Sequence, residues 1–243
     1  VLTGIILLVA LGRYGPIPQD PEYHQFSDTA TWFSIPNTLN VVSNLPFLLT
    51  GLFCFLAMVR DKRDYLMCRM NRNAYLVFFL GIALVGLGSA YYHLSPDNET
   101  LFWDRLPMTV AFMALYSIII AEFISEKTGK RLLWPLIVIG VFSVLYWAYT
   151  ESIYAGDLRL YAWVQFFPVL TIPVVLLMFK TGYSGARGYW ALSVCYVLAK
   201  ICEHFDAEIH DLLVIISGHS LKHILPVIGL AYLYSGYMNK DRL

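Results

Sequence analysis

The chain consists largely of long apolar segments that alternate with short charged loops. A membrane-spanning helix needs roughly 20 mainly apolar residues. Only 14% of this chain is charged, against roughly 25% in an ordinary soluble domain. We therefore predict an all-α, polytopic transmembrane bundle of seven core helices with a short N-terminal hydrophobic segment. The apolar segments lie at about 1–12, 38–59, 74–92, 102–121, 132–150, 159–179, 188–202 and 214–237.

The first apolar segment is short for a membrane span, which favours dividing the chain into two parts. We expect residues 1–36 to form an N-terminal hydrophobic segment and an outer loop. Residues 37–243 are then expected to form one seven-helix membrane domain. Neither an internal repeat nor a long linker divides this domain further.

The 17 basic and 17 acidic residues cancel to a net charge of zero, so no basic excess indicates a nucleic-acid partner. The charges nevertheless separate by loop, and the acidic residues gather on one predicted face. Because Lys and Arg in short loops are retained in the cytoplasm, we predict a cytoplasmic C-terminus and an outer or lumenal acidic face. The basic residues of the predicted cytoplasmic loops are Arg60, Lys62, Arg63, Arg69, Arg72, Lys127, Lys130, Arg131, Lys180, Arg187, Lys240 and Arg242.

Five polar residues stand at the outer ends of apolar segments, where ionisable groups are costly and commonly functional. Ser89 and His93 are four residues apart and share a helix face, and Asp104 follows at the start of the next segment. His219 and His223 have the same spacing in the last segment. The predicted topology brings all five to one membrane depth.

Three histidines are a sufficient set of protein ligands for a catalytic zinc ion. We therefore predict a zinc site made by His93, His219 and His223. A nearby carboxylate such as Asp104 is suited to accept the proton of an attacking water, and the Ser89 hydroxyl is suited to donate to a developing oxyanion. A single His pair in a membrane helix more often makes interhelical hydrogen bonds, and only the meeting of three histidines and an aspartate favours metal.

The stretches NTLNVVSNLPFLLTGLF, GSAYYHLSPDNETLFWDRLPMT, KICEHFDAEI and SGHSLKHI are similar to those of the alkaline ceramidase family, in particular of its bacterial-type members. This family belongs to a superfamily of seven-helix membrane hydrolases that includes adiponectin-type receptors. By this resemblance His93, His219 and His223 would bind zinc, Asp104 would accept a proton and Ser89 would stabilise the oxyanion. The implied reaction cleaves the amide of ceramide, or of a related N-acyl lipid, to a fatty acid and a sphingoid base. The resemblance extends from about Asn37 to Leu230.

The N-terminal part departs from the eukaryotic pattern of the family, which includes a calcium site in this region. Here the upstream stretch reads QDPEYHQFSD. Asp20, Glu22 and Asp28 are candidate calcium ligands, since Ca²⁺ prefers oxygen ligands. Arg105 also stands where ceramidases commonly have an acidic residue.

Other interpretations compete with a lipid amidase. A seven-helix receptor or scaffold could keep the same zinc for structural reasons. A retinal protein is a third interpretation, suggested by Lys222 in the last segment, although Lys222 lies between two candidate zinc ligands. An ion channel is disfavoured, because the polar residues cluster at one membrane depth rather than along a path through the bilayer. We expect Asn40, Ser43 and Asn44 to hydrogen-bond other helices. Lys200 and Glu203 either form a helix-end ion pair or support the metal site.

Overall fold

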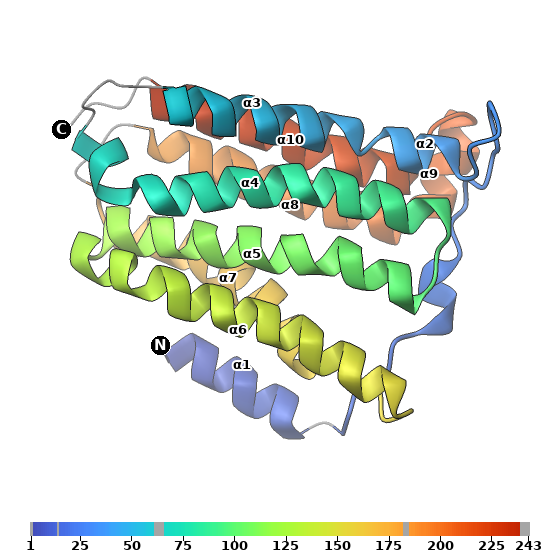
Figure 1. Cartoon of the computed structure of the whole chain (residues 1–243), viewed down its shortest axis with the longest axis horizontal. Coiled ribbons are helices and arrows are strands. Elements are labelled where there is room, and N and C mark those ends of the chain that lie inside the picture. Colours follow the sequence, from blue (N-terminus) through green and yellow to red (C-terminus); the bar gives the residue numbers. More distant parts are fainter. Residues whose placement is uncertain (1, 14, 61–65, 182–184, 239–243) are drawn as a thin grey trace.

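The computed structural model describes residues 2–13, 15–60, 66–181 and 185–238. Long helices lie side by side and alternate in direction (Figure 1). This arrangement confirms the predicted all-α bundle. The helices are α1 (Leu2–Arg13), the 3-10 helix η1 (Pro21–His24), α2 (Thr38–Val42), α3 (Leu45–Arg60), α4 (Leu66–Leu94), α5 (Asn98–Phe123), α6 (Glu126–Ser152), α7 (Arg159–Met178), α8 (Ala186–His204), α9 (Asp206–Leu213) and α10 (Gly218–Met238).

Several of these helices are long and apolar enough to cross a membrane, which confirms a multi-pass membrane protein. Five qualify within the described residues: Thr38–Arg60, Asn71–Leu94, Asn98–Phe123, Glu126–Ser152 and Arg159–Met178. A sixth qualifies if α9 and α10, which are bent by 97° at their junction, form one broken span. Helix α1 has 12 residues and is about 18 Å long. It is thus shorter than a hydrocarbon core of about 30 Å.

The last predicted segment differs from the observed helices. Helix α10 begins at Gly218 rather than near residue 214, and the separate helix α9 precedes it. Val214 ends α9 with a φ of 65°, a conformation that interrupts a right-handed helix. The Asp206 carboxylate then accepts a hydrogen bond from the backbone N–H of His219 at 2.6 Å. It thereby satisfies a free donor at the start of α10.

Gly88 allows α4 to approach α5 closely. A Cβ atom at Gly88 would overlap the carbonyl oxygen of Trp103 and lie 3.3 Å from the backbone nitrogen of Asp104. The close approach brings the end of α4, which carries Ser89 and His93, against the part of α5 that carries Asp104.

This contact predicts an effect of added volume. Gly88→Ala should lower the free energy of unfolding by about 1–3 kcal/mol, because backbone atoms must move to admit the methyl group. Gly12→Ala is the matched control, since a Cβ at Gly12 meets nothing within 4 Å. Thermal unfolding of the two variants checks the prediction. Equal or higher stability of Gly88→Ala relative to wild type would contradict it.

The described basic loop residues share one end of the bundle. The ends of α3, α5, α7 and α10 and the starts of α4, α6 and α8 meet there (Figure 1). The three predicted zinc-site histidines lie toward the opposite end. This grouping agrees with the predicted separation of charge, while the side of the membrane stays a prediction. Lys62, Arg63, Lys240 and Arg242 lie outside the described residues.

Candidate metal centre

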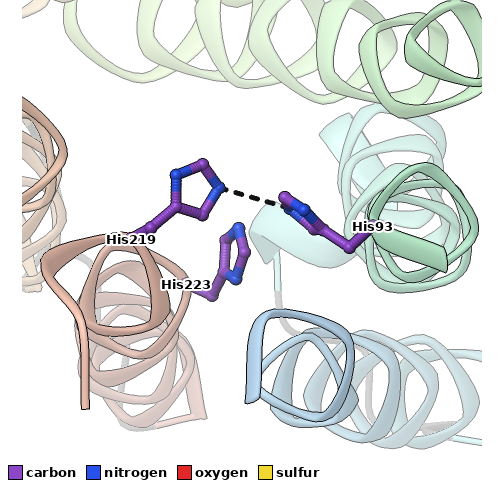
Figure 2. Close-up of side chains that lie close together, drawn as sticks. All are labelled: His93, His219 and His223. Carbon is purple, nitrogen blue, oxygen red and sulfur yellow. Dashed lines mark hydrogen bonds between the residues drawn. The ribbon is translucent and has the colours of Figure 1, made fainter. Parts of the chain in front are cut away.

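Three histidine side chains from two helices point toward one another (Figure 2). His93 comes from α4, and His219 and His223 come from α10. One ring nitrogen from each lies within 4.8 Å of the others. The Nε2 atoms of His93 and His219 are 3.3 Å apart. All three residues are buried, with exposed fractions of 1%, 6% and 5%. The structure thus brings together the side chains that the sequence analysis selected.

The chemistry of this group fits a bound cation. Buried polar atoms normally have hydrogen-bond partners. Yet the Nδ1 atom of His93 is buried and has no partner among the described residues. Three imidazole nitrogens are a ligand set that zinc commonly takes in proteins, and they leave a position for a substrate or water. The three histidines could therefore hold a metal ion.

Two polar residues of the turn between α2 and α3 contact the ring of His223. The Ser43 hydroxyl lies 2.8 Å from Nδ1 of His223, and the Asn44 amide nitrogen lies 3.3 Å from the same atom. Ser43 also donates to the backbone carbonyl of Asn40. If its single proton is used there, Nδ1–H of His223 donates to Ser43 and leaves Nε2 unprotonated, as metal binding requires. The Asn44 NH2 group, which donates to the Asn40 carbonyl, then only touches Nδ1 without a hydrogen bond.

The expected interhelical bonds of Asn40 and Ser43 are therefore present, and Ser43 bonds directly to a candidate ligand. The Asn40 side chain accepts a hydrogen bond from Ser220 of α10 at 2.9 Å. Sequence reasoning did not connect these residues with the metal site. The available signal was their polarity within an otherwise apolar segment.

The loop before α2 covers the histidines at the end of the bundle opposite the basic loops. The ring of Phe26 lies 4.7 Å from that of His93 and 4.5 Å from that of His219, centroid to centroid. The Asn37 amide donates to the carbonyl of His93 at 2.9 Å, and the backbone N–H of Ser27 donates to Asp206 at 3.0 Å. These contacts tie the N-terminal loop to both helices that carry the histidines.

Ser89 and Asp104 lie next to each other beside the histidines. Ser89 is buried on α4, and Asp104 is partly buried on α5. The Ser89 hydroxyl faces the Asp104 carboxylate. Both residues line, together with His223, a cavity of about 200 Å³. A carboxylate and a hydroxyl therefore face the same space as a candidate metal ligand.

The start of α5 is fixed by a reciprocal cap. The Asp97 carboxylate accepts the backbone N–H of Thr100 at 2.7 Å, and the Thr100 hydroxyl accepts the backbone N–H of Asp97 at 3.1 Å. The Thr100 N–H lowers the pKa of Asp97 below its usual value. The stabilisation by this cap is therefore present at neutral pH and is lost as the pH falls through the lowered pKa.

The cavity continues from these polar groups into the apolar interior of the bundle. Residues of α3, α4, α5, α7, α8 and α10 line it, and most are apolar. Its deeper lining includes Phe47, Phe78, Met108, Phe112 and Leu230. Its apolar lining suits a lipid chain.

The candidate calcium ligands Asp20, Glu22 and Asp28, unlike the three histidines, do not form a group at metal-binding separation. Asp20 is exposed and accepts the backbone N–H of Glu22, which is also exposed. Asp28 is buried and accepts the backbone N–H of Ala30. Over the described ranges, the three histidines alone form a group of at least three His, Cys, Asp or Glu ligand atoms at metal-binding separation. Calcium binding stays a prediction.

Comparison with known protein families shows to which family the chain belongs. The sequence model of the family described as Ceramidase matches residues 31–239, most of the chain. The protein belongs to the ceramidase family. Ceramidases are hydrolases that cleave the amide bond of ceramide, so the chain is an enzyme of lipid metabolism, as predicted. The match includes all three histidines, Ser89 and Asp104, whereas Asp20, Glu22 and Asp28 lie before it.

Arg105, the residue that departs from the ceramidase pattern, is turned into an aromatic enclosure. Its guanidinium carbon lies 4.4 Å from the ring centroid of Trp147 and 4.7 Å from that of Tyr161. It donates to the Gln19 side chain at 2.6 Å. Arg105 is buried and is not among the residues that line the cavity, so it stabilises the first part of α5.

Proposed function

We propose that the protein is a zinc-dependent ceramidase that hydrolyses ceramide or a related N-acyl lipid to a fatty acid and a sphingoid base. The observation that carries the proposal is the meeting of His93, His219 and His223, with His223 lining a mostly apolar cavity that Ser89 and Asp104 also line. Bound there, zinc would activate a water molecule as nucleophile and polarise the amide carbonyl.

In this proposal the protein residues supply proton transfer and orientation. Asp104 accepts a proton from the attacking water and returns it to the departing amine nitrogen as the C–N bond breaks. The Ser89 hydroxyl donates a hydrogen bond to the carbonyl oxygen as negative charge develops on it. Ser43 holds His223, and the apolar lining holds the acyl chain and excludes water from it.

The polar end of the cavity lies away from the basic loops, so the proposal places hydrolysis toward the outer or lumenal leaflet. The alternative of a receptor or scaffold with a structural zinc is less favoured, because a carboxylate and a hydroxyl face the cavity beside the histidines. Lys222, the residue that a retinal protein would need, donates to Glu203 at 2.7 Å.

Mass-spectrometric detection of products tests the proposed function. The purified, zinc-loaded protein is incubated with ceramide and with other N-acyl lipids. Equimolar release of fatty acid and amine is the expected result. A protein that binds zinc but releases neither product from any lipid of the panel would instead support the receptor or scaffold.

A further inference from the structure

The charged groups of the cavity lie at one end, beside the proposed reaction site. Lys200 and Lys222 both pair with Glu203, at 2.5 Å and 2.7 Å, and all three residues line the cavity. The expected pair of Lys200 and Glu203 is thus present and also includes a lysine of α10. His223 directly follows Lys222 and, like Asp104, lines the cavity. An acyl chain therefore meets an apolar lining in the direction away from these groups.

In that direction the lining stops at a similar depth on α4 and α5. On α4 it runs from Ser89 to Phe78, and on α5 it runs from Asp104 to Leu115. The residues of each pair are eleven positions apart, about 16 Å along a helix axis. On α8 the lining ends at Tyr189, three residues after the helix begins. Because Ser89 and Asp104 belong to the proposed reaction site, the cavity extends about 16 Å beyond that site.

Hydrogen bonds hold Tyr189 at this depth. The Tyr189 hydroxyl donates to one oxygen of Glu122 at 2.8 Å, and the Tyr75 hydroxyl donates to the other. Tyr75 lies less than one turn beyond Phe78 on α4, so these bonds place Tyr189 at the level where the lining stops. Neither Glu122 nor Tyr75 lines the cavity. The Tyr189 hydroxyl is thus directed away from the cavity, and the Tyr189 ring closes it.

The closing ring is fixed in place. Tyr189, Glu122 and Tyr75 are buried, with exposed fractions of 2%, 5% and 1%. Rotation of the Tyr189 side chain would remove a donor from a buried carboxylate, which is costly. The Phe123 ring also packs edge-on against the Tyr189 ring, with 5.8 Å between the centroids. A lipid chain that reaches Tyr189 therefore has to end there or bend.

The depth of the cavity corresponds to a chain length. An extended saturated chain advances about 1.25 Å per C–C bond of about 1.5 Å, so about 16 Å holds about 13 carbons beyond the carbonyl. The chain enters the cavity from the hydrocarbon of a membrane, so each further methylene gains little from the transfer. Methylenes beyond Tyr189 instead have to displace packed side chains, which weakens binding.

We infer that Tyr189, held by Glu122, is a specificity-determining residue that limits the N-acyl chain of the substrate to about 14 carbons. The enzyme then hydrolyses ceramides with acyl chains up to this length and discriminates against ceramides with longer ones. This inference rests on the proposed function, because it assigns the chain-length preference of the same site.

A series of ceramides that share one sphingoid base tests the inference with the zinc-loaded enzyme in a lipid bilayer. The specificity constant kcat/KM should be similar for lauroyl and myristoyl ceramide and about tenfold lower for stearoyl ceramide. Shortening the sphingoid base at a fixed acyl chain should change kcat/KM little. Equal constants for myristoyl and stearoyl ceramide, or a length limit that follows the base instead, would overturn the inference.

The variant Tyr189→Leu removes the closing ring and its bond to Glu122, so the stearoyl-to-myristoyl ratio of kcat/KM should rise toward one. Tyr237→Leu is the matched control, because Tyr237 is also a buried tyrosine but does not line the cavity. The ratio for Tyr237→Leu should equal that of wild type. A folded Tyr189→Leu enzyme with an unchanged ratio would overturn the inference.

Ala111→Leu tests the same path if Tyr189→Leu does not fold. Ala111 lines the cavity on α5, seven residues and about 10 Å from Asp104. The larger side chain should obstruct a long acyl chain, so kcat/KM for myristoyl ceramide should fall about tenfold relative to octanoyl ceramide. An unchanged ratio would mean that the acyl chain does not follow this lining, which would overturn the inference.

A binding measurement separates this inference from the proposed function. In lipid nanodiscs, myristate should raise the Tm of the wild-type protein more than an equal amount of stearate does, and Tyr189→Leu should lose this difference. If no ceramide is hydrolysed, the proposed function fails and this comparison alone decides the inference. Stabilisation of the wild type by stearate that equals or exceeds stabilisation by myristate would then overturn it.

Discussion

Asp104→Asn should lower the kcat of ceramide hydrolysis by at least about 100-fold, the usual lower range for loss of a general acid or base. An amide has nearly the size of the carboxylate but cannot accept the proton of the attacking water. Asp104 is not part of the three-histidine group. The variant should therefore retain wild-type zinc content while it loses activity, and metal analysis together with product release checks both parts.

Asp97→Asn provides the matched control for this substitution. Asp97 lies on the same side of the bundle and caps α5, but it does not line the cavity. Asn caps a helix about as well as Asp, so this variant should keep nearly full activity. Similar activities of the two variants would contradict a proton-transfer role for Asp104.

His219→Ala should reduce zinc from about one ion per chain to near zero and abolish hydrolysis, because two histidines remain where three are needed. The hydrogen bond from residue 219 to Asp206 uses the backbone N–H and survives the substitution. The start of α10 should therefore keep its cap. Inductively coupled plasma mass spectrometry of the purified variant measures the loss of metal.

The Tm distinguishes loss of metal from loss of fold. A ligand that binds only the folded state raises the Tm, so a chelator should lower the Tm of wild type. It should leave the Tm of His219→Ala unchanged. His204→Ala is the control, since His204 is exposed and lies outside the three-histidine group. Stoichiometric zinc in His219→Ala would contradict the assignment of this ligand.

Local sequence patterns predict much of this fold and of its candidate site. The apolar segments are long enough to identify the main helices, because a helix in a membrane must satisfy its backbone internally. The spacing of four residues places His219 and His223 on one helix face, and the same rule pairs Ser89 with His93. The two pairs can meet because the segments that carry them place them at the same membrane depth.

Features that depend on contacts between distant residues were not predicted. Helix α9 depends on the conformation of Val214 and on the bond from Asp206 to the start of α10. The contact of Ser43 with His223 joins residues 180 positions apart. Lys222 joins Glu203 through the packing of α10 against α8. No periodicity within one segment encodes such contacts.

Ceramide hydrolysis before and after metal removal tests the central claim, a catalytic zinc centre, most directly. The purified protein is assayed as isolated, after treatment with a chelator, and after zinc is added back, with fatty acid and sphingoid base measured together. We predict that hydrolysis disappears with the metal and returns with zinc. Undiminished hydrolysis by the metal-free protein, or none by the zinc-loaded protein, would contradict the account.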